Sequence, residues 1–344
     1  MNPLKNEKKF NVTALGNALV DMEFEVENSD LQKLKVEKGT MTLVDEERQH
    51  FLTESLNGIF HRKSCGGSAA NTMIALAQLG GAGFYSCKVA DDELGHFYHA
   101  DLLRNHLSCN LKSDRLEKGK TGKCLVMITP DADRTMNTFL GMTANFSSAD
   151  VDFETITQSA WLYLEGYLVT GEKSFQAMLE AIKVAKAHDV KVALTFSDVN
   201  MVNYFRPQMD ALLDAGIDLL FCNEAEALCY ANIEGGTESS RFEQTIALLK
   251  KRVPMGAITL GSKGAYVYNK HEHGMIVSTP IKAIDTNGAG DLFAGAFLYA
   301  ITHGENILEA GRLGVYLAGV LVTQFGARLK LEQVQELKKV FYPA

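Results

Sequence analysis

The residues with the clearest capacity for chemistry lie in a glycine-rich segment that reads Asp285-Thr-Asn-Gly-Ala-Gly-Asp291. A strand-like stretch, 276–284, precedes it, and a helical stretch, 292–302, follows it. Free backbone N–H groups at the start of a helix stabilise negative charge, and glycines let a ligand approach the backbone closely. The segment therefore predicts an anion hole. Its residues are Gly288, Ala289 and Gly290.

Asp291 lies in the first turn of that predicted helix. Its carboxylate can accept a proton from an attacking hydroxyl while the neighbouring amides stabilise charge on a transferred phosphoryl group. Two simpler readings exist, in which Asp291 only caps the helix or Asn287-Gly288 forms a hairpin turn. A hairpin needs a second strand, whereas the residues after Asp291 are typical of a buried helix. The segment therefore predicts phosphoryl transfer with Asp291 as general base.

Regularly spaced apolar runs indicate the elements that position this segment. Strands are predicted at 10–19, 84–89, 161–164, 190–196, 219–222 and 257–259. Helices are predicted at 68–79, 174–188, 204–213 and 239–252. This alternation predicts an α/β fold with a doubly wound, mostly parallel sheet flanked by helices.

A small β-sheet lid is predicted from two insertions in this pattern. Residues 21–27 alternate in polarity, and the stretches 124–129 and 135–140 flank a polar turn, Pro130-Asp-Ala-Asp-Arg134, as in a hairpin. We assign residues 1–17, 46–118 and 144–344 to a large α/β catalytic domain. Residues 18–45 and 119–143 are assigned to the small β lid.

The composition of the 344 residues, with 46% hydrophobic and 22% charged side chains, is that of a globular enzyme. A net charge of −8 offers no broad cationic surface, so neither nucleic acid nor a membrane is expected as a partner. The six cysteines show no C-x-x-C spacing, and the charged first ten residues lack the apolar run of a signal peptide. We therefore expect reduced thiols and a cytoplasmic location.

The segment from Asp285 to Asp291 resembles the C-terminal signature of the PfkB (ribokinase-like) family, which includes ribokinase, fructokinase and adenosine kinase. Three further motifs resemble that family in the expected order: Gly16-Asn-Ala-Leu-Val-Asp21, Gly66-Gly-Ser-Ala-Ala-Asn71 and Asn223-Glu-Ala-Glu226. Together they extend over nearly the whole chain. The resemblance implies a kinase that uses ATP and Mg²⁺ to phosphorylate the hydroxymethyl group of a sugar or nucleoside.

The resemblance also implies roles for individual residues. Acceptor-binding residues would be Asn17, Asp21, Gly66, Gly67, Asn71 and Arg134, of which Arg134 would reach toward the phosphates. Nucleotide-binding residues would be Asn223, Thr259, Gly261 and Gly264. Glu226 would organise Mg²⁺ through water, and Asp285 and Asn287, with the backbone of 325–327, would form a monovalent cation (K⁺) site.

Each of these motifs has a structural alternative. Asn223 and Glu226 also form a capping box, the glycine pair also suits a strand-to-helix turn, and Asp21 or Arg134 also suits a solvated surface. A non-catalytic nucleotide- or sugar-binding regulator on the same fold is the alternative from another class, and an intact Asp291 argues against it.

The acceptor is left open by the sequence. Asn287 and the Gly16–Asp21 segment look more like adenosine kinase than ribokinase, so an adenosine kinase-like enzyme is predicted, with a sugar kinase as the alternative. Monomer and homodimer are both retained, because a lid with an exposed sheet face would favour a dimer.

Overall fold

A nine-stranded sheet forms the centre of the computed structural model, which describes residues 8–56, 60–131 and 133–343, and only the backbone of 60–62. Its strand order is β14-β13-β12-β11-β10-β9-β1-β5-β6. The neighbouring strands β12-β11-β10-β9-β1-β5-β6 run parallel to one another. β13 and β14 are antiparallel additions at the β12 edge. The strands are β1 Phe10–Leu15, β5 Gly83–Ser86, β6 Ser108–Cys109, β9 Ser159–Glu165, β10 Lys191–Thr195, β11 Leu219–Asn223, β12 Met255–Thr259, β13 Gly264–Tyr268 and β14 His273–Val277.

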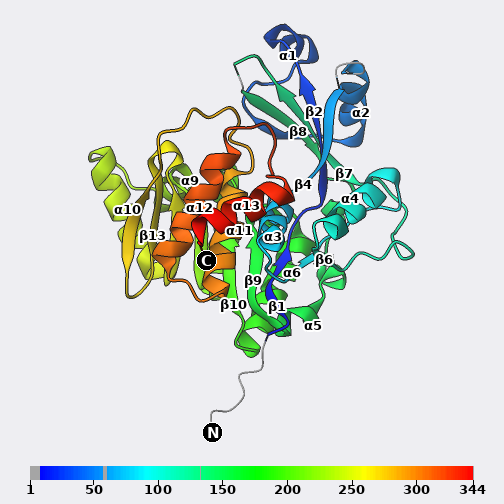
Figure 1. Cartoon of the computed structure of the whole chain (residues 1–344). Helices are drawn as coiled ribbons and strands as arrows, with labels where there is room; N and C mark the ends of the chain where they lie inside the picture. The colour runs from blue at the N-terminus through cyan, green and yellow to red at the C-terminus, as the bar shows by residue number, and fades with distance from the viewer. Residues whose placement is uncertain (1–7, 57–59, 132, 344) are drawn as a thin grey trace.

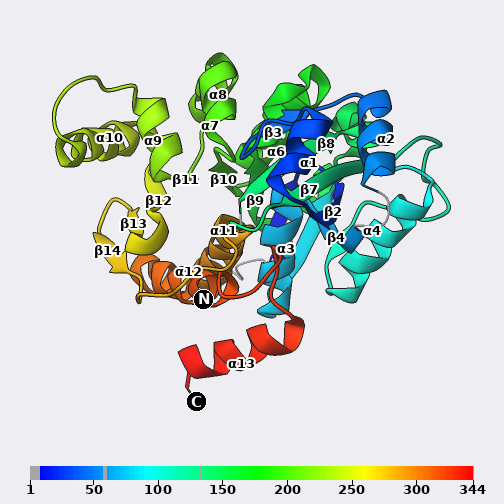
Figure 2. The same ribbon diagram turned by 90° about the horizontal axis from the view of Figure 1, so that it is seen from above.

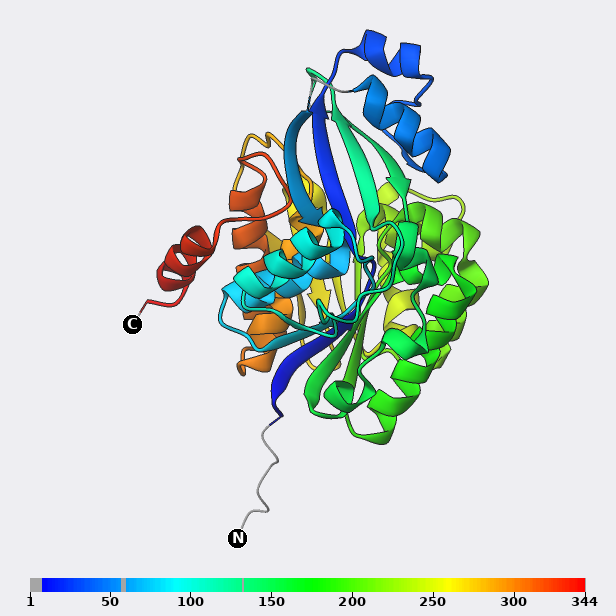
Figure 3. The ribbon, with the colours of Figure 1, turned by 90° about the vertical axis from the view of Figure 1, so that its right-hand side faces the viewer.

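Helices cover both faces of this sheet (Figures 1 and 3). Along β9, Trp161 and Tyr163 face one apolar cluster, and Leu162 and Leu164 face the other, as expected for a strand buried on both sides. The first cluster includes α3 Ser68–Gln78, α4 Glu93–Arg104, α11 Ala289–Thr302, α12 Ile307–Leu321 and α13 Leu331–Phe341. The second includes α5 Phe153–Thr157, α6 Glu172–Ala187, α7 Val199–Tyr204, α8 Arg206–Asp214, α9 Glu224–Ala231 and α10 Glu238–Arg252. The predicted doubly wound α/β fold is confirmed.

A second sheet of five strands, in the order β3-β8-β7-β2-β4, rises above the carboxyl ends of the main sheet (Figures 1 and 3). Its strands are β2 Leu19–Glu25, β3 Met41–Leu43, β4 Phe60–Gly66, β7 Gly122–Ile128 and β8 Arg134–Phe139. The predicted hairpin is the antiparallel pair β7–β8. Strand β4 falls in the range 46–118 that we assigned to the large domain, so three chain segments build this sheet, which we call the lid.

One face of the lid is covered by α1 Asn28–Leu34 and α2 Glu46–Ser55, which are seen from above in Figure 2. Leu31 and Leu52 from these helices pack with Phe24, Leu125 and Met127 of the sheet. The sheet face that would have favoured a homodimer is therefore covered on this side, and the choice between monomer and homodimer stays a prediction. Among helices in the described part of the chain, none has the length and apolarity needed to cross a membrane.

The predicted strand 10–19 is wrong, because the chain changes sheet at Gly16. β1 ends at Leu15 and β2 begins at Leu19. Between them the Gly16 amide still donates to the Ser86 carbonyl oxygen of β5 at 3.4 Å, but the next two amides donate to side chains. The amide of Asn17 donates to Glu165, and the amide of Ala18 donates to the Thr143 hydroxyl at 3.1 Å. The apolar run continues through this break, so the sequence pattern conceals it.

The predicted strand 276–284 is also misplaced, because the strand in this region, β14, begins at His273. β14 ends at Val277, and the chain then runs without regular structure to α11. Pro280 lies just after this point and cannot donate a ladder hydrogen bond. Two smaller differences are that β5 ends at Ser86 rather than at residue 89, and that the predicted helix 204–213 corresponds mainly to α8, with α7 ending at Tyr204.

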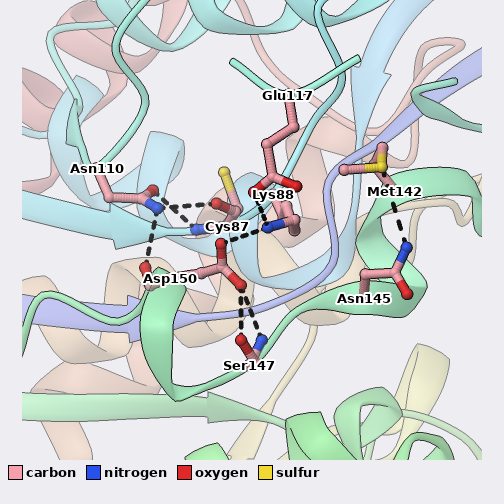
Figure 4. Close-up of polar contacts among 8 residues, drawn as sticks. All are labelled: Cys87, Lys88, Asn110, Glu117, Met142, Asn145, Ser147 and Asp150. Atoms are coloured by element: carbon pink, nitrogen blue, oxygen red, sulfur yellow. Dashed lines mark hydrogen bonds and ion pairs between the residues drawn. The ribbon is translucent and has the colours of Figure 1, made fainter. Parts of the chain in front are cut away.

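The return from the lid to β9 is fixed by a polar cluster around Asp150 (Figure 4). The carboxylate of Asp150 pairs with Lys88 at 2.8 Å and accepts from the amide and hydroxyl of Ser147. Lys88 also pairs with Glu117 at 2.8 Å, and Asn110 donates to the Asp150 carbonyl at 2.9 Å. This segment therefore attaches the lid to the edge of the main sheet near β5 and β6.

Candidate active site

A cavity of about 380 Å³ lies where the carboxyl ends of the parallel strands meet the lid. Residues at the ends of four neighbouring strands line it: Glu165 of β9, Thr195 of β10, Asn223 of β11 and Thr259 of β12. The carboxyl edge of an open parallel sheet is where ligands bind in such folds. The sequence-predicted site residues that line this cavity are Asn17, Asp21, Gly67, Asn71, Asn223, Glu226, Thr259, Asn287, Gly288, Gly290 and Asp291.

The start of α11 has the form expected of an anion hole. Its N-cap is Gly288, which has a left-handed φ of 72° and no side chain to accept from the first-turn N–H groups. A Cβ at Gly288 would lie 2.2 Å from the carbonyl oxygen of Ala327, so only glycine fits. No side chain caps these N–H groups, although the Ala289 amide donates to the carbonyl oxygen of Thr286 at 3.3 Å. The helix dipole favours an anion there.

The carboxylate of Asp291 is held from the neighbouring helix α3. Its Oδ1 accepts from the Ser68 hydroxyl at 2.7 Å, and its Oδ2 accepts from the Asn71 amide at 3.0 Å. Burial raises the pKa of Asp291, while these two hydrogen bonds and the charge of Arg328 lower it. The side chain thus faces the cavity and is oriented by α3, which is more than a helix cap requires.

Asp21 and the glycine pair form the opposite wall of the site. A Cβ at Gly66 would lie 2.2 Å from Asp21 Oδ1, so the glycine makes room for this carboxylate. Gly67 has a φ of 95°, and a Cβ there would lie 2.3 Å from the carbonyl oxygen of Asn17. Burial raises the pKa of Asp21 to about 7, against an opposing effect of Arg328. The glycine pair is therefore a close-packed turn that sets Asp21 and Asn17 beside α3.

Asn223 and Glu226 form a capping box at the start of α9. Asn223 Oδ1 accepts from the Glu226 amide at 2.8 Å, and Glu226 accepts from the Asn223 amide and side chain at 3.1 and 2.7 Å. Both residues also line the cavity, so the cap and a binding role coexist. Glu226 is only 5% exposed, and burial, together with the charges of Asp198 and Asp291, raises its pKa to about 7.

The raised pKa of Glu226 predicts how stability depends on pH. Below its ordinary pKa of 4.5 the carboxyl is protonated whether the chain is folded or unfolded, and its contribution to stability is lost as pH rises toward the folded value of about 7. Glu226→Gln removes this loss. In metal-free buffer we expect its unfolding free energy, relative to the wild type, to increase by about 3 kcal/mol between pH 5 and pH 8.

Denaturant unfolding at both pH values measures this difference. Glu224→Gln is the matched control, because Glu224 lies in the same helical turn but outside the cavity wall. A constant difference between Glu226→Gln and the wild type from pH 5 to pH 8 would contradict the raised pKa of the buried Glu226 carboxyl.

A second cavity, of about 300 Å³, lies on the other side of the α11 start. The predicted nucleotide-side residues Thr259, Gly261 and Gly264 line it, and Ala289 closes it beside the helix. Its walls continue along α12 and the loop after β14 through Val315, Ala318, Val322, Thr279 and Ile281. Thr259, Gly290 and Phe293 line both cavities, so the two spaces meet at the first turn of α11.

Arg134 and Asp285 contact each other and line neither cavity. The Arg134 guanidinium, from lid strand β8, pairs with Asp285 Oδ2, and Asp285 also accepts from the amides of Asn287 and Gly326 at 2.9 and 2.7 Å. The side chain of Asp285 is 1% exposed and that of Arg134 is 13% exposed. In this structure the pair joins the lid to the loop that leads into α11, and one Arg134 nitrogen, Nη1, is buried without a partner among the described residues.

Three residues that line the site or contact its wall were missed from the sequence: Ser68, Glu165 and Arg328. Ser68 directly follows the glycine pair, so the motif itself could have drawn attention to it. Glu165 directly follows the predicted strand 161–164 and ends β9, and a carboxylate at the carboxyl end of a buried strand is a usable signal. It is 1% exposed and accepts from the backbone amides of Asn17 and Ala69. The sequence around Arg328 contains no motif that would have indicated its position near the site.

The chain is similar to known kinases over nearly its full length. Residues 39–334 match the sequence model of the pfkB family carbohydrate kinases. The adenosine kinase of Schizophyllum commune is 27% identical, over 95% of this chain and 99% of that protein. The crystal structure of adenosine kinase from Sinorhizobium meliloti has a TM-score of 0.88 and 31% identity, covering 96% of this chain and 99% of that one. A probable sugar kinase from Rhizobium etli CFN 42 has a TM-score of 0.87 and 30% identity, covering 96% and 98%.

Proposed function

The chain belongs to the PfkB family of carbohydrate kinases, and on that premise we propose that it transfers the γ-phosphoryl group of ATP to the hydroxymethyl group of adenosine or a closely similar nucleoside. One observation carries the proposal most directly. The two cavities meet at Gly290, where the uncapped start of α11 lies beside the carboxylate of Asp291. An acceptor on one side and a nucleotide on the other would bring their reacting groups together at this point.

The proposed chemistry uses groups that are already oriented. Asp291, held by Ser68 and Asn71, takes the proton from the acceptor hydroxyl as that oxygen attacks the γ-phosphorus. The amides of 288–290 stabilise the charge on the transferred group, and the bond to the β-phosphate oxygen breaks as ADP leaves. Asn17, Asp21 and Asn71 supply polar groups to the acceptor's other hydroxyls.

The lid side of the first cavity favours a nucleoside over a simple sugar. The side chains that the lid and its junctions contribute are mainly apolar: Leu19, Met41, Leu43, Cys124, Met136 and Leu140. A planar base gains from burial against such a surface, whereas a sugar bearing hydroxyls on every side would leave them unpaired there. The polar floor formed by Asn17, Asp21 and Asn71 suits the ribose. Phosphorylation of a free sugar is the second candidate, supported by that same floor and by the similarity to the Rhizobium etli protein.

We further propose that Glu226 and Asn223 organise the Mg²⁺ that accompanies ATP. The negative charges of Asp198 and Asp291 act on Glu226 and help raise its pKa, so the potential at this end of the cavity is negative, which fits a divalent cation. Within the described residues, no group of three or more His, Cys, Asp or Glu side chains is arranged as a metal cage, so water and phosphate oxygens would supply most ligands. The cation would neutralise phosphate charge.

A K⁺ site at Asp285 and Asn287 requires a rearrangement. The Asp285 carboxylate accepts from two backbone amides and pairs with Arg134, so hydrogen-bond donors surround it in this structure. We propose that Arg134 leaves Asp285 for the phosphates when ATP and acceptor bind, which would free this carboxylate for a monovalent cation. The Nη1 of Arg134, which has no hydrogen-bond partner among the described residues, supports such a second bonding arrangement.

The lid would exclude water from the transfer. A base that activates a hydroxyl can also activate water, so closure over the acceptor limits wasteful hydrolysis of ATP. The intact Asp291 and the start of α11, which no side chain caps, argue against the alternative of a non-catalytic regulator. The six cysteines are free thiols, which supports the proposed cytoplasmic location.

A substrate panel tests the proposal. Purified protein with ATP and Mg²⁺ is assayed against adenosine, other nucleosides, ribose and fructose, and each phosphorylated product is identified by mass. We expect adenosine to have the highest kcat/KM, by at least about tenfold, because only a base fills the apolar lid wall. A free sugar as the dominant acceptor would replace the first candidate with the second. ATP binding with no phosphorylated product would support the regulator.

A further inference from the structure

Arg328, between α12 and α13, contacts three parts of the chain behind the proposed base. Its Nε donates to Asn71 Oδ1 at 2.7 Å, and its Nη1 pairs with Asp101 Oδ2 of α4 at 2.7 Å. Its Nη2 donates to the carbonyl oxygen of Cys65, the residue before the glycine pair. The side chains of Arg328 and Asp101 are 17% and 16% exposed. These three directed contacts hold the planar guanidinium in one orientation. A lysine side chain at this position could not reproduce their geometry.

The contact with Asn71 determines which way its amide points. Arginine can only donate hydrogen bonds, so the atom of Asn71 that faces Nε must be the oxygen. The Asn71 nitrogen then faces Asp291 and donates to Oδ2 at 3.0 Å. A reversed amide would place two donors against each other at Arg328 and two acceptors against each other at Asp291. Arg328 therefore fixes the donor that orients the Asp291 carboxylate.

We propose that Arg328 is a positioning residue for phosphoryl transfer: it holds the Asn71 amide against Asp291, and its charge keeps that carboxylate ready to accept a proton. This inference rests on the proposed function of Asp291 as general base. Because the same guanidinium binds the Cys65 carbonyl, it also ties the end of lid strand β4 to this arrangement. The C-terminal segment thus joins the lid strand, the asparagine and the base.

The charges around Asp291 give this role a measurable signature. Burial raises the pKa of Asp291, and Arg328 is the positive charge that lowers it. The other titratable groups whose charges act with that of Asp291 are acidic: Asp21 of β2, Tyr163 and Glu165 of β9, Tyr167 after β9, and Glu226 of α9. Loss of the Arg328 charge should therefore raise the pKa of Asp291, because the titratable groups that remain are acidic and disfavour its negative charge.

The test is the pH profile of kcat/KM for the acceptor in Arg328→Met. A general base must be deprotonated to act, so activity falls as pH drops through its pKa. We expect the acidic limb of the profile to move to higher pH by about one unit, as for loss of a nearby opposite charge. The loss of activity is then larger at pH 6 than at pH 9. Arg328→Lys keeps the positive charge and should move the acidic limb less than Arg328→Met does. It should still lower kcat, because lysine lacks the planar guanidinium that holds Asn71.

Asp101→Asn is the matched control, since it removes a partner of Arg328 without touching Asn71 or Asp291. It should leave the acidic limb within about 0.3 unit of the wild type. An unmoved limb in Arg328→Met, with activity lowered equally at every pH, would overturn the proposal and leave a purely structural role. If Arg328→Met does not fold, Arg328→Gln supplies the neutral side chain for the same measurement. Absence of phosphorylated product in the wild type would instead overturn the proposed function.

Discussion

Asp291→Asn should lower kcat by at least about two orders of magnitude, as removal of a general base does in other enzymes. ATP binding should be preserved, because the amides of the α11 start and the second cavity are unchanged. The fold should also be preserved. The new amide can keep its oxygen toward Asn71 and turn its nitrogen toward Ser68, whose hydroxyl can accept as well as donate.

Turnover, ATP affinity and thermal unfolding together decide this prediction. A large fall in kcat with wild-type ATP affinity and unfolding temperature is the expected pattern. Near-normal turnover would rule out Asp291 as the base. If kcat falls because Asp291→Asn loses its folded state, the same three measurements are made on Ser68→Ala. That variant removes one hydrogen bond to Asp291 and leaves the carboxylate in place.

Gly288→Ala should abolish most activity because it distorts the anion hole. Gly290→Ala should lower turnover without changing the stability of the fold. At Gly288 a Cβ would meet the Ala327 carbonyl at 2.2 Å in a left-handed backbone conformation, so the turn must move. We expect a loss in kcat/KM for ATP of about 10²–10³, comparable to loss of a donor from an anion hole, together with a lower unfolding temperature. At Gly290 a Cβ would meet no atom within 4 Å.

Gly290→Ala should therefore fold as the wild type does. It should still lose about tenfold or more in turnover, because Gly290 lines both cavities and the added methyl would narrow their junction at the transferred phosphoryl group. Wild-type kinetics in both variants would show that phosphoryl transfer takes place away from the α11 start. Wild-type stability with lost activity in Gly290→Ala alone would support transfer at this junction.

Local signals in the sequence were enough for the parts of the site that one short segment builds. The glycine turn and Asp291 form a continuous motif, and the predicted helix follows it, although α11 begins at Ala289, three residues before the predicted stretch 292–302. Asn223 and Glu226 are three residues apart and form the capping box that this spacing predicts. In both cases the residues that interact are neighbours in sequence, so their types and spacing contain the geometry.

Contacts between distant segments could not be predicted in this way. Arg328 reaches Asn71 across 257 positions, and Arg134 reaches Asp285 across 151. Glu165 binds the backbone amide of Asn17, and a side chain that binds a backbone amide leaves no mark on the sequence of its partner. The same physics explains the missed break at Gly16, because the turn there is held by Glu165 and Thr143 rather than by a local turn motif.

The most direct test of the central claim follows ATP and adenosine through a single reaction with purified protein and Mg²⁺, and quantifies ADP and the phosphorylated nucleoside by mass spectrometry and ³¹P NMR. We expect one phosphorylated nucleoside for each ADP formed, with the phosphate on the hydroxymethyl oxygen, and loss of both products in Asp291→Asn. Formation of ADP and inorganic phosphate without a phosphorylated acceptor, or transfer that persists in Asp291→Asn, would contradict it.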